Sequence, residues 1–310
     1  MIPSVSVIIP AYNAEVSIIH ALNSVLCQSI GDIEVIVIND CSEDRTLELL
    51  MTVKDPRLRI LNNIQNVGPA ASRNKGIDVA IGQYIAFLDA DDALHPQYIE
   101  YLLNCTAGLG PKSVLASDIW ICKSKPDGSM SPLYRKFSRS RLCATGFTVN
   151  PITLAALIDH HIDIKPFMQR QALLEDNVRF WDSARGEEWL PFLVELLLKG
   201  WQFFLVNEGL YYYGVHKSNL SRSYRMIVRE QVSIDRLIQE CALDAITLEA
   251  LKRYRAFLRA RAPWVALRCG RFKEFIQGLE GCPAAIWFPI HKLVVLRYGF
   301  CLRKNRACGE

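Results

Sequence analysis

Residues 84–92, YIAFLDADD, carry the pattern that decides the fold. An apolar run of strand-forming residues ends in three carboxylates, Asp89, Asp91 and Asp92, which predicts a buried strand with acids at its carboxyl end. Like charges this close raise one another's pKa values unless a cation compensates them. Oxygen ligands of this kind suit Mg²⁺ or Mn²⁺, which often complete their shells with substrate phosphate oxygens. Taken alone, the triplet fits equally well a helix start at which Asp91 and Asp92 serve as caps.

The rest of the first hundred residues alternates short β-branched runs with helical patterns. Strands are predicted at VSVIIP (5–10), IEVIVIND (33–40) and LRILNN (58–63), and helices at about 14–27, after Ser42 and from Pro69. Strands separated by helices of this length indicate parallel βαβ units with both faces of the sheet covered. Ligands of such sheets bind at the carboxyl ends of the strands, where Asp40 and Asp89 fall.

The pattern loosens after Pro96. A strand followed by a hairpin-like turn at 126–128 is predicted within 113–130, and the polar, basic stretch after it, through Arg141, is expected to be mobile. A helix over 187–198 and a short strand over 202–206 close this part of the chain. Beyond the segment YYYGVHKSNLSRS the pattern is helical to the end.

Composition and charge bound the class of protein. The ten cysteines show no C-x-x-C pairing and are interpreted as reduced thiols of a cytoplasmic protein. The first residues, MIPSVSVIIPAYN, have no basic region typical of a signal peptide. Residues 251–310 carry a net charge of +10 and residues 1–250 carry −6, within a total of +4. A basic tail on an acidic body points to an anionic surface such as a membrane or a nucleic acid.

Four ordered blocks carry a family resemblance. VSVIIPAYN (5–13), VIVINDCSEDRT (35–46), NVGPAASRNKG (66–76) and YIAFLDADD (84–92) together resemble the family 2 glycosyltransferases with the GT-A fold. The resemblance is close over the first hundred residues and weaker to about residue 220. It implies an α/β, Rossmann-like, mostly parallel sheet flanked by helices. The implied GT-A domain is 1–220, with a nucleotide-sugar-binding half (1–105) and an acceptor-binding half (106–220), followed by a helical, basic extension (221–310).

The resemblance also implies a role for each residue of the nucleotide-sugar site. Asp40 would accept a hydrogen bond from the uracil ring, and Arg73 would face the diphosphate, as suits a guanidinium near phosphate. Asp91 would bind Mn²⁺ or Mg²⁺, with Asp89 near the ribose and the waters of the metal. The remaining nucleotide-sugar contacts would be Pro10, Ala11, Tyr12, Asn13 and Ala90. The alternatives are a helix-start carboxylate for Asp40 and a solvated helix residue for Arg73.

The second half supplies a candidate base and a candidate metal contact. FWDSARGEEWLPFL resembles the family segment in which an acidic pair opens a helix that faces the acceptor. That assigns Glu188 as general base with Glu187 in support, although glutamates also favour the start of any helix. In YYYGVHKSNLSRS, His216 is a candidate contact of the metal or the diphosphate, and equally a surface or packing residue. The chain departs from the family's usual aspartates at Asn39 and Glu188.

The predicted function is that of an inverting, non-processive, metal-dependent enzyme. It would move one sugar, by default glucose, from a UDP-sugar to a lipid-linked oligosaccharide or other glycan acceptor in exopolysaccharide biosynthesis. The Q-x-x-R-W motif of the processive synthases is absent from the sequence, as are their membrane spans. The protein is expected to be cytoplasmic and to bind the inner face of the membrane through its basic tail. The aromatic residues of the tail also suit an interface of lipid and water, so no nucleic-acid partner is expected.

Three other classes of function stand beside this prediction. A catalytically silent scaffold that binds a nucleotide sugar or a polysaccharide would be expected to lack Asp91 or Glu188, and both are present. A sugar nucleotidyltransferase would open with a glycine-rich phosphate loop, where this chain has PAYNAEVS. A dehydrogenase would carry a G-x-G-x-x-G after a strand, and none is found.

Overall fold

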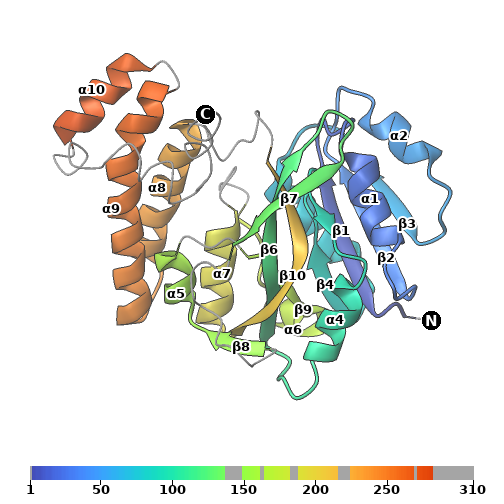
Figure 1. Cartoon of the computed structure of the whole chain (residues 1–310). Coiled ribbons are helices and arrows are strands. Elements are labelled where there is room, and N and C mark those ends of the chain that lie inside the picture. Colours follow the sequence, from blue (N-terminus) through green and yellow to red (C-terminus); the bar gives the residue numbers. More distant parts are fainter. Residues whose placement is uncertain are drawn as a thin grey trace, which may run out of the picture. The chain divides into compact units, whose positions relative to one another are not determined.

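A computed structural model describes residues 2–136, 149–160, 164–181, 188–215, 224–268 and 271–281. The chain divides into two compact units, Met1–Ser218 and Asn219–Glu310. The first unit contains the strands and the second is helical over its described part (Figure 1). The stretch after the hairpin turn, expected to be mobile through Arg141, instead forms the strand Met130–Arg135 at its start, because its backbone pairs with the strand before the turn. Residues 137–141, Glu187 and His216 fall outside the described residues.

The first unit begins as the sequence predicts. Strands and helices alternate in the order β1 (Val5–Ala11), α1 (Ile18–Leu26), β2 (Ile33–Asn39), α2 (Thr46–Thr52), β3 (Leu58–Asn62), α3 (Pro69–Val79) and β4 (Tyr84–Phe87). The four strands lie parallel in the order β3-β2-β1-β4. β1 and β2 are buried along their whole length, as expected of strands in the middle of a covered parallel sheet.

Helix α3 packs closely on this sheet because of a glycine. A Cβ atom at Gly76 would lie 2.4 Å from Cγ2 of Ile8 in β1, so no larger residue fits without movement. The helix starts after Gly68, whose φ of 92° is unfavourable for residues with a side chain, and Pro69 occupies the first turn, where its missing N–H costs nothing. Arg73 is thereby held on a helix that lies against β1 and β2.

The second half of this unit adds six strands and four helices among the described residues. They are β5 (Ala93–Leu94), α4 (Tyr98–Cys105), β6 (Ser113–Ser124), β7 (Met130–Arg135), β8 (Val149–Ile152), α5 (Leu154–Asp159), β9 (Phe167–Gln169), α6 (Arg170–Glu175), α7 (Trp189–Leu198) and β10 (Gln202–Val215). The hairpin of β6 and β7 is confirmed. Helix α7 falls where a helix was predicted.

Two features of the sheet differ from the sequence prediction. The predicted short strand over 202–206 is wrong in length, because β10 continues to Val215 through an irregularity around Gly209 at which its pairing with β6 shifts register. A β-bulge places extra residues in one strand, so that the strand can continue beyond a local break in its pairing. The sheet is also mixed beyond β4, because the short strand β9 runs antiparallel between β4 and β6. The parallel prediction therefore holds for the first four strands, within a mixed sheet flanked by helices.

The second unit is helical over its described part. It comprises α8 (Tyr224–Glu240), α9 (Ala245–Arg268) and α10 (Phe272–Gly281). α8 and α9 are joined by a buried hydrogen bond from the Tyr254 hydroxyl to Glu230 and by an ion pair of 2.7 Å between Arg255 and Asp235. Across the described ranges, no helix has the length and apolar character needed to span a membrane. The apolar stretch near Trp287 lies outside these ranges.

Candidate active site

Asp40 follows β2 and organises the loop that leads into α3. Its carboxylate is buried and accepts hydrogen bonds from Nδ2 of Asn63 (2.8 Å) and from the backbone N–H groups of Val67 (3.0 Å) and Gly68 (2.8 Å). Asp40 therefore fixes the backbone at the start of α3. A contact between Asp40 and a uracil ring stays a prediction.

The predicted residues of the first loop differ in their exposure. Pro10 and Ala11 belong to β1 and pair with β2, whereas Tyr12, directly after the strand, is 46% exposed. Asn13 has a φ of 48° and accepts a hydrogen bond of 2.8 Å from the backbone N–H of Glu43. This bond ties the loop after β1 to the loop after β2. Of these residues, Tyr12 and Asn13 are exposed and Pro10 and Ala11 are buried.

Asp89 follows β4 and lies between two cations. Its Oδ1 accepts a hydrogen bond of 2.7 Å from Nη2 of Arg73, and its Oδ2 accepts one from the ammonium group of Lys165. Burial opposes ionisation of Asp89, but the charges of Lys165 and Arg73 outweigh burial and hold the pKa of Asp89 well below its usual range. The negative charge of an ionised Asp89 is thus compensated by two side chains of the protein.

Asp92 is a structural residue of the triplet. It is completely buried, and it accepts hydrogen bonds from the hydroxyl of Tyr211 (2.6 Å) and from the backbone N–H of Gly214 (2.8 Å) on β10. Burial, together with the neighbouring charges of Asp91 and Asp89, raises the pKa of Asp92 well above its ordinary value. Asp92 therefore joins β10 to the end of β4 and is unsuited to hold a cation.

Arg73 is buried, which excludes the alternative of a solvated helix residue. Its side chain is 4% exposed, and the guanidinium lies over the rings of Trp189 (4.6 Å to the centroid) and Phe180 (5.4 Å). Its Nη1 is 3.7 Å from Oε2 of Glu188. One guanidinium thus contacts both Asp89 and the candidate base, which the sequence placed about a hundred residues apart.

Glu188 immediately precedes α7 and is also buried, at 4% exposure. The segment before α7 is held to α3 by Asn74, whose side-chain amide exchanges two hydrogen bonds with the backbone of Phe180 (2.8 and 2.9 Å). Phe180 stacks on Phe192 of α7, with ring centroids 4.0 Å apart. The contacts of Phe180, which precedes the undescribed residues 182–187, and the packing of α7, which follows them, therefore set the position of Glu188 beside Arg73.

Asp91 is the acid of the triplet that suits a metal best. It is partly exposed, whereas Asp92 is buried and both oxygens of Asp89 accept hydrogen bonds from cations. Within the ranges that the structure describes, no three side chains of histidine, cysteine, aspartate or glutamate gather closely enough to hold a metal ion. A single carboxylate fits Mg²⁺ or Mn²⁺ when substrate phosphates and waters supply the other ligands. The residues present thus agree with a metal that binds together with its substrate.

Lys165 is the residue that the sequence analysis missed. It lies just before β9, and the antiparallel register that sets Phe167 opposite Ala86 brings it beside the end of β4. The three-residue strand β9 is too short to show a period in the sequence. One signal was available: Lys165 is a lone charge in the stretch IKPFM, which is otherwise apolar.

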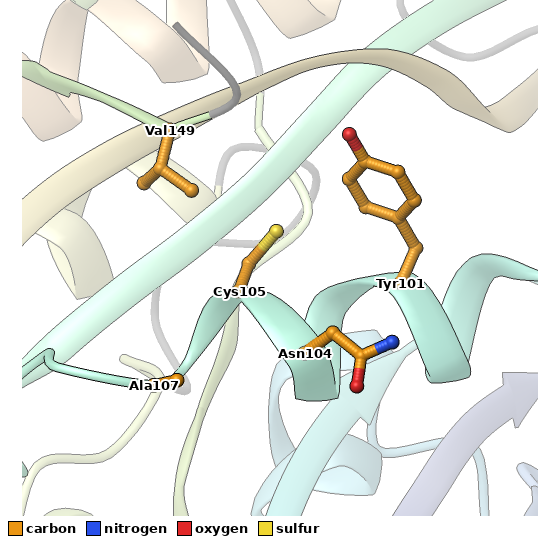
Figure 2. A pocket seen from close by; sticks show the side chains of 5 residues that line it. All are labelled: Tyr101, Asn104, Cys105, Ala107 and Val149. Atoms are coloured by element: carbon orange, nitrogen blue, oxygen red, sulfur yellow. The ribbon is translucent and has the colours of Figure 1, made fainter.

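A separate hollow of about 330 Å³ lies on the first unit away from these acids. It is lined by Tyr101, Asn104, Cys105, Ala107 and Val149, with Cys105 of α4 across from Val149 at the start of β8 (Figure 2). The lining contains no carboxylate and no cation. Five cysteines in the described part of the chain, Cys105 among them, are free thiols, in agreement with the expectation of reduced cysteines.

The fold and the site together define an α/β protein with an acidic site at the carboxyl ends of its parallel strands. Residues 6–143 match the sequence profile of the family described as Glycosyl transferase family 2. The chain is a glycosyltransferase that carries a family 2 domain with the GT-A fold.

Similar proteins extend the comparison beyond the matched domain. The succinoglycan biosynthesis protein ExoO of Rhizobium meliloti is 28% identical over 84% of this chain and 76% of its own length. The putative glycosyltransferase EpsH of Bacillus subtilis is 26% identical over 72% of this chain and 64% of its own. The crystal structure of S. aureus TarS 1-349 in complex with UDP-GlcNAc has a TM-score of 0.66 at 20% identity and covers 94% of this chain and 83% of that one. At that identity the likeness to TarS shows the fold.

Proposed function

We propose that the chain is an inverting, non-processive glycosyltransferase that moves one sugar from a UDP-sugar to a lipid-linked oligosaccharide acceptor. The observation that carries this proposal is the cluster at the end of β4. There, Asp91 lies beside an ion-paired group formed by Asp89, Arg73, Lys165 and Glu188. The cluster joins a candidate metal ligand to a candidate base at the edge of the sheet where ligands of such folds bind.

In the proposed reaction the residues of the chain have separate roles. Glu188 removes the proton of the acceptor hydroxyl, for which a positioned carboxylate typically contributes about 10²- to 10⁴-fold. Asp91 holds Mn²⁺ or Mg²⁺, which stabilises negative charge on the departing nucleoside diphosphate when it is bound. Arg73 orients both Glu188 and Asp89, since it contacts both. One base and a single displacement invert the anomeric centre, so an α-linked donor gives a β-linked product.

The donor and the pathway rest on similarity. TarS is described in complex with UDP-GlcNAc and ExoO as a succinoglycan biosynthesis protein, which supports a UDP-sugar donor and a role in polysaccharide synthesis. Glucose is the default sugar, and UDP-GlcNAc is the first alternative. The basic tail supports a location at the inner face of a membrane, where a lipid-linked acceptor lies.

A donor panel tests the proposal. The chain is incubated with UDP-, GDP- and dTDP-sugars with and without Mn²⁺, and release of nucleoside diphosphate is measured. Metal-dependent turnover of one UDP-sugar is expected, and NMR of the glycoside formed on a lipid-linked acceptor is expected to show inversion. Turnover of no donor, together with no metal-dependent binding of UDP, would favour a scaffold that has lost catalysis.

A further inference from the structure

Lys165 is a buried ammonium group beside the predicted metal site. Its side chain is 6% exposed, and Nζ donates to Oδ2 of Asp89. The ammonium also lies 4.8 Å from the ring centroid of Trp189 and 5.8 Å from that of Tyr211, so aromatic faces favour the cation at this position. Because burial of an unpaired charge is costly, Lys165 and Asp89 hold each other in place.

The two oxygens of Asp89 are divided between two cations. Arg73 takes Oδ1 at 2.7 Å and Lys165 takes Oδ2. A divalent cation bound directly to either oxygen would stand within a few ångströms of a fixed positive charge, and the repulsion at such distances is large. The described geometry thus opposes direct coordination by Asp89, although the sequence predicts Asp89 as a supporting metal ligand.

The other two acids of the triplet are placed differently from Asp89. Asp92 is completely buried and accepts hydrogen bonds from Tyr211 and Gly214. Asp91 is partly exposed, so a cation that enters together with the phosphates of its substrate can reach it.

We propose that Lys165, together with Arg73, withholds Asp89 from the divalent cation, so that Asp91 is the carboxylate of the triplet that coordinates it. This inference rests on the proposed function. Lys165 is a positioning residue, and its effect is to keep the metal weakly bound by the free protein and dependent on the diphosphate. Asp89 then stays available to hydrogen-bond the donor from a fixed position.

The test is a calorimetric titration of Mn²⁺ into the full chain saturated with UDP. Lys165→Met keeps the apolar stem and removes the charge, so Asp89 gains the freedom to coordinate the metal. The expected result is a rise in Mn²⁺ affinity on the order of tenfold, from the loss of one nearby positive charge. A general loss of structure would lower this affinity, which makes the direction of the change diagnostic.

Three further variants make the result interpretable. Lys165→Arg keeps the charge and is expected to bind Mn²⁺ as the wild type does. The double variant Lys165→Met with Asp89→Asn leaves no unpaired buried carboxylate and is expected to return the affinity to the wild-type value. Lys112→Met is the control. It removes a lysine that forms an ion pair of 2.8 Å with Asp176, and it is expected to leave the Mn²⁺ affinity unchanged.

An unchanged or lower Mn²⁺ affinity in a folded Lys165→Met variant would overturn the inference, with folding checked by circular dichroism. A higher Mn²⁺ affinity in Lys165→Arg would also overturn the inference. Mn²⁺ binding that the wild type shows and Asp91→Asn loses would support the proposed metal site whatever the result for Lys165. If the wild type itself shows no Asp91-dependent binding, both the proposed metal site and the role of Lys165 are refuted.

Discussion

The three aspartates after β4 have different surroundings, although they stand within four positions of one another. Asp92 is buried under Tyr211 and Gly214, Asp89 is paired with Arg73 and Lys165, and Asp91 is partly exposed. The order of residues cannot reveal this division, because it depends on β10 and on the segment before β9. A side chain added at Gly214 would start 2.3 Å from the carbonyl oxygen of Asp91, which shows how tightly β10 approaches the triplet.

Glu188→Gln tests the base at the scale of a single residue. The amide cannot accept the proton of the acceptor hydroxyl, so kcat is expected to fall by roughly 10²- to 10⁴-fold. Donor binding is expected to stay near the wild-type value, because glutamine has the size of Glu188 and keeps an oxygen that can face Arg73. Single-turnover transfer and calorimetric binding of UDP separate the two effects. A variant with full kcat would show that another group removes the proton.

The residues of the candidate site were predictable to different degrees. Asp89, Asp91 and Arg73 could be singled out because they stand in blocks that resemble the family, and Glu188 because its segment resembles the one in which an acidic pair opens a helix. The ion pairs among them were not predictable, since they join α3, β4 and the start of α7. Lys165 was missed altogether, because its partner is set by tertiary pairing.

At the scale of elements, the alternation of strands and helices over the first hundred residues was predicted with its order intact. The strands there are short apolar runs, and helices of seven to eleven residues separate them. Beyond α4 two strands are very short, β8 with four residues and β9 with three, and β9 pairs antiparallel with strands that come earlier in the chain. Short strands of this kind are specified by their neighbours, which explains why the sequence showed β6 and the turn that leads into β7 but neither β8 nor β9.

Asp176 joins three elements and gives a pH prediction at this scale. It ends α6, and it accepts hydrogen bonds from Lys112 before β6 (2.8 Å) and from the indole N–H of Trp201 before β10 (2.7 Å). The hydrogen bond from Lys112 is the main cause of a lowered pKa of Asp176. A lowered pKa in the folded state means that the charged form stabilises the fold above the unfolded pKa, and that this stability is lost as the pH falls.

Asp176→Asn is therefore expected to lower the free energy of unfolding by about 1 kcal/mol near neutral pH, a modest value because Lys112 is partly exposed and screened by solvent. The difference from the wild type should shrink as the pH falls below the ordinary aspartate pKa of about 3.9. Urea unfolding of both proteins at several pH values measures this difference in the free energy of unfolding. An equal difference at neutral and acidic pH would refute the ionic role of Asp176.

At the scale of the whole molecule, the chain combines an acidic body with a basic tail. Residues 1–250 carry −6 and residues 251–310 carry +10, and the structure divides into units at Ser218. On α9 of the second unit, Lys252, Arg253 and Arg259 are exposed. A charge separation of this kind favours contact of the tail with an anionic surface.

Removal of residues 219–310 is expected to abolish binding to vesicles that contain phosphatidylglycerol, measured by co-sedimentation at about 0.1 M salt. The full chain should bind such vesicles and be released at high salt. The exchange of Lys252 and Arg253 for glutamate in the full chain serves as a milder test, and it should weaken binding without loss of helical structure. Unchanged vesicle association of the shortened chain would exclude the tail as the membrane contact.

We propose that Asp91 holds the metal of the glycosyltransferase site at the end of β4. The most direct test is the Mn²⁺-dependent turnover of the preferred UDP-sugar by Asp91→Asn. Asp32→Asn is the control, because Asp32 is an exposed aspartate that accepts a hydrogen bond from Ser4. We predict a loss of at least about 100-fold for Asp91→Asn, as when one group that stabilises developing charge is removed, and wild-type turnover for Asp32→Asn. Wild-type, metal-dependent turnover in a folded Asp91→Asn variant would show that Asp91 does not hold the metal.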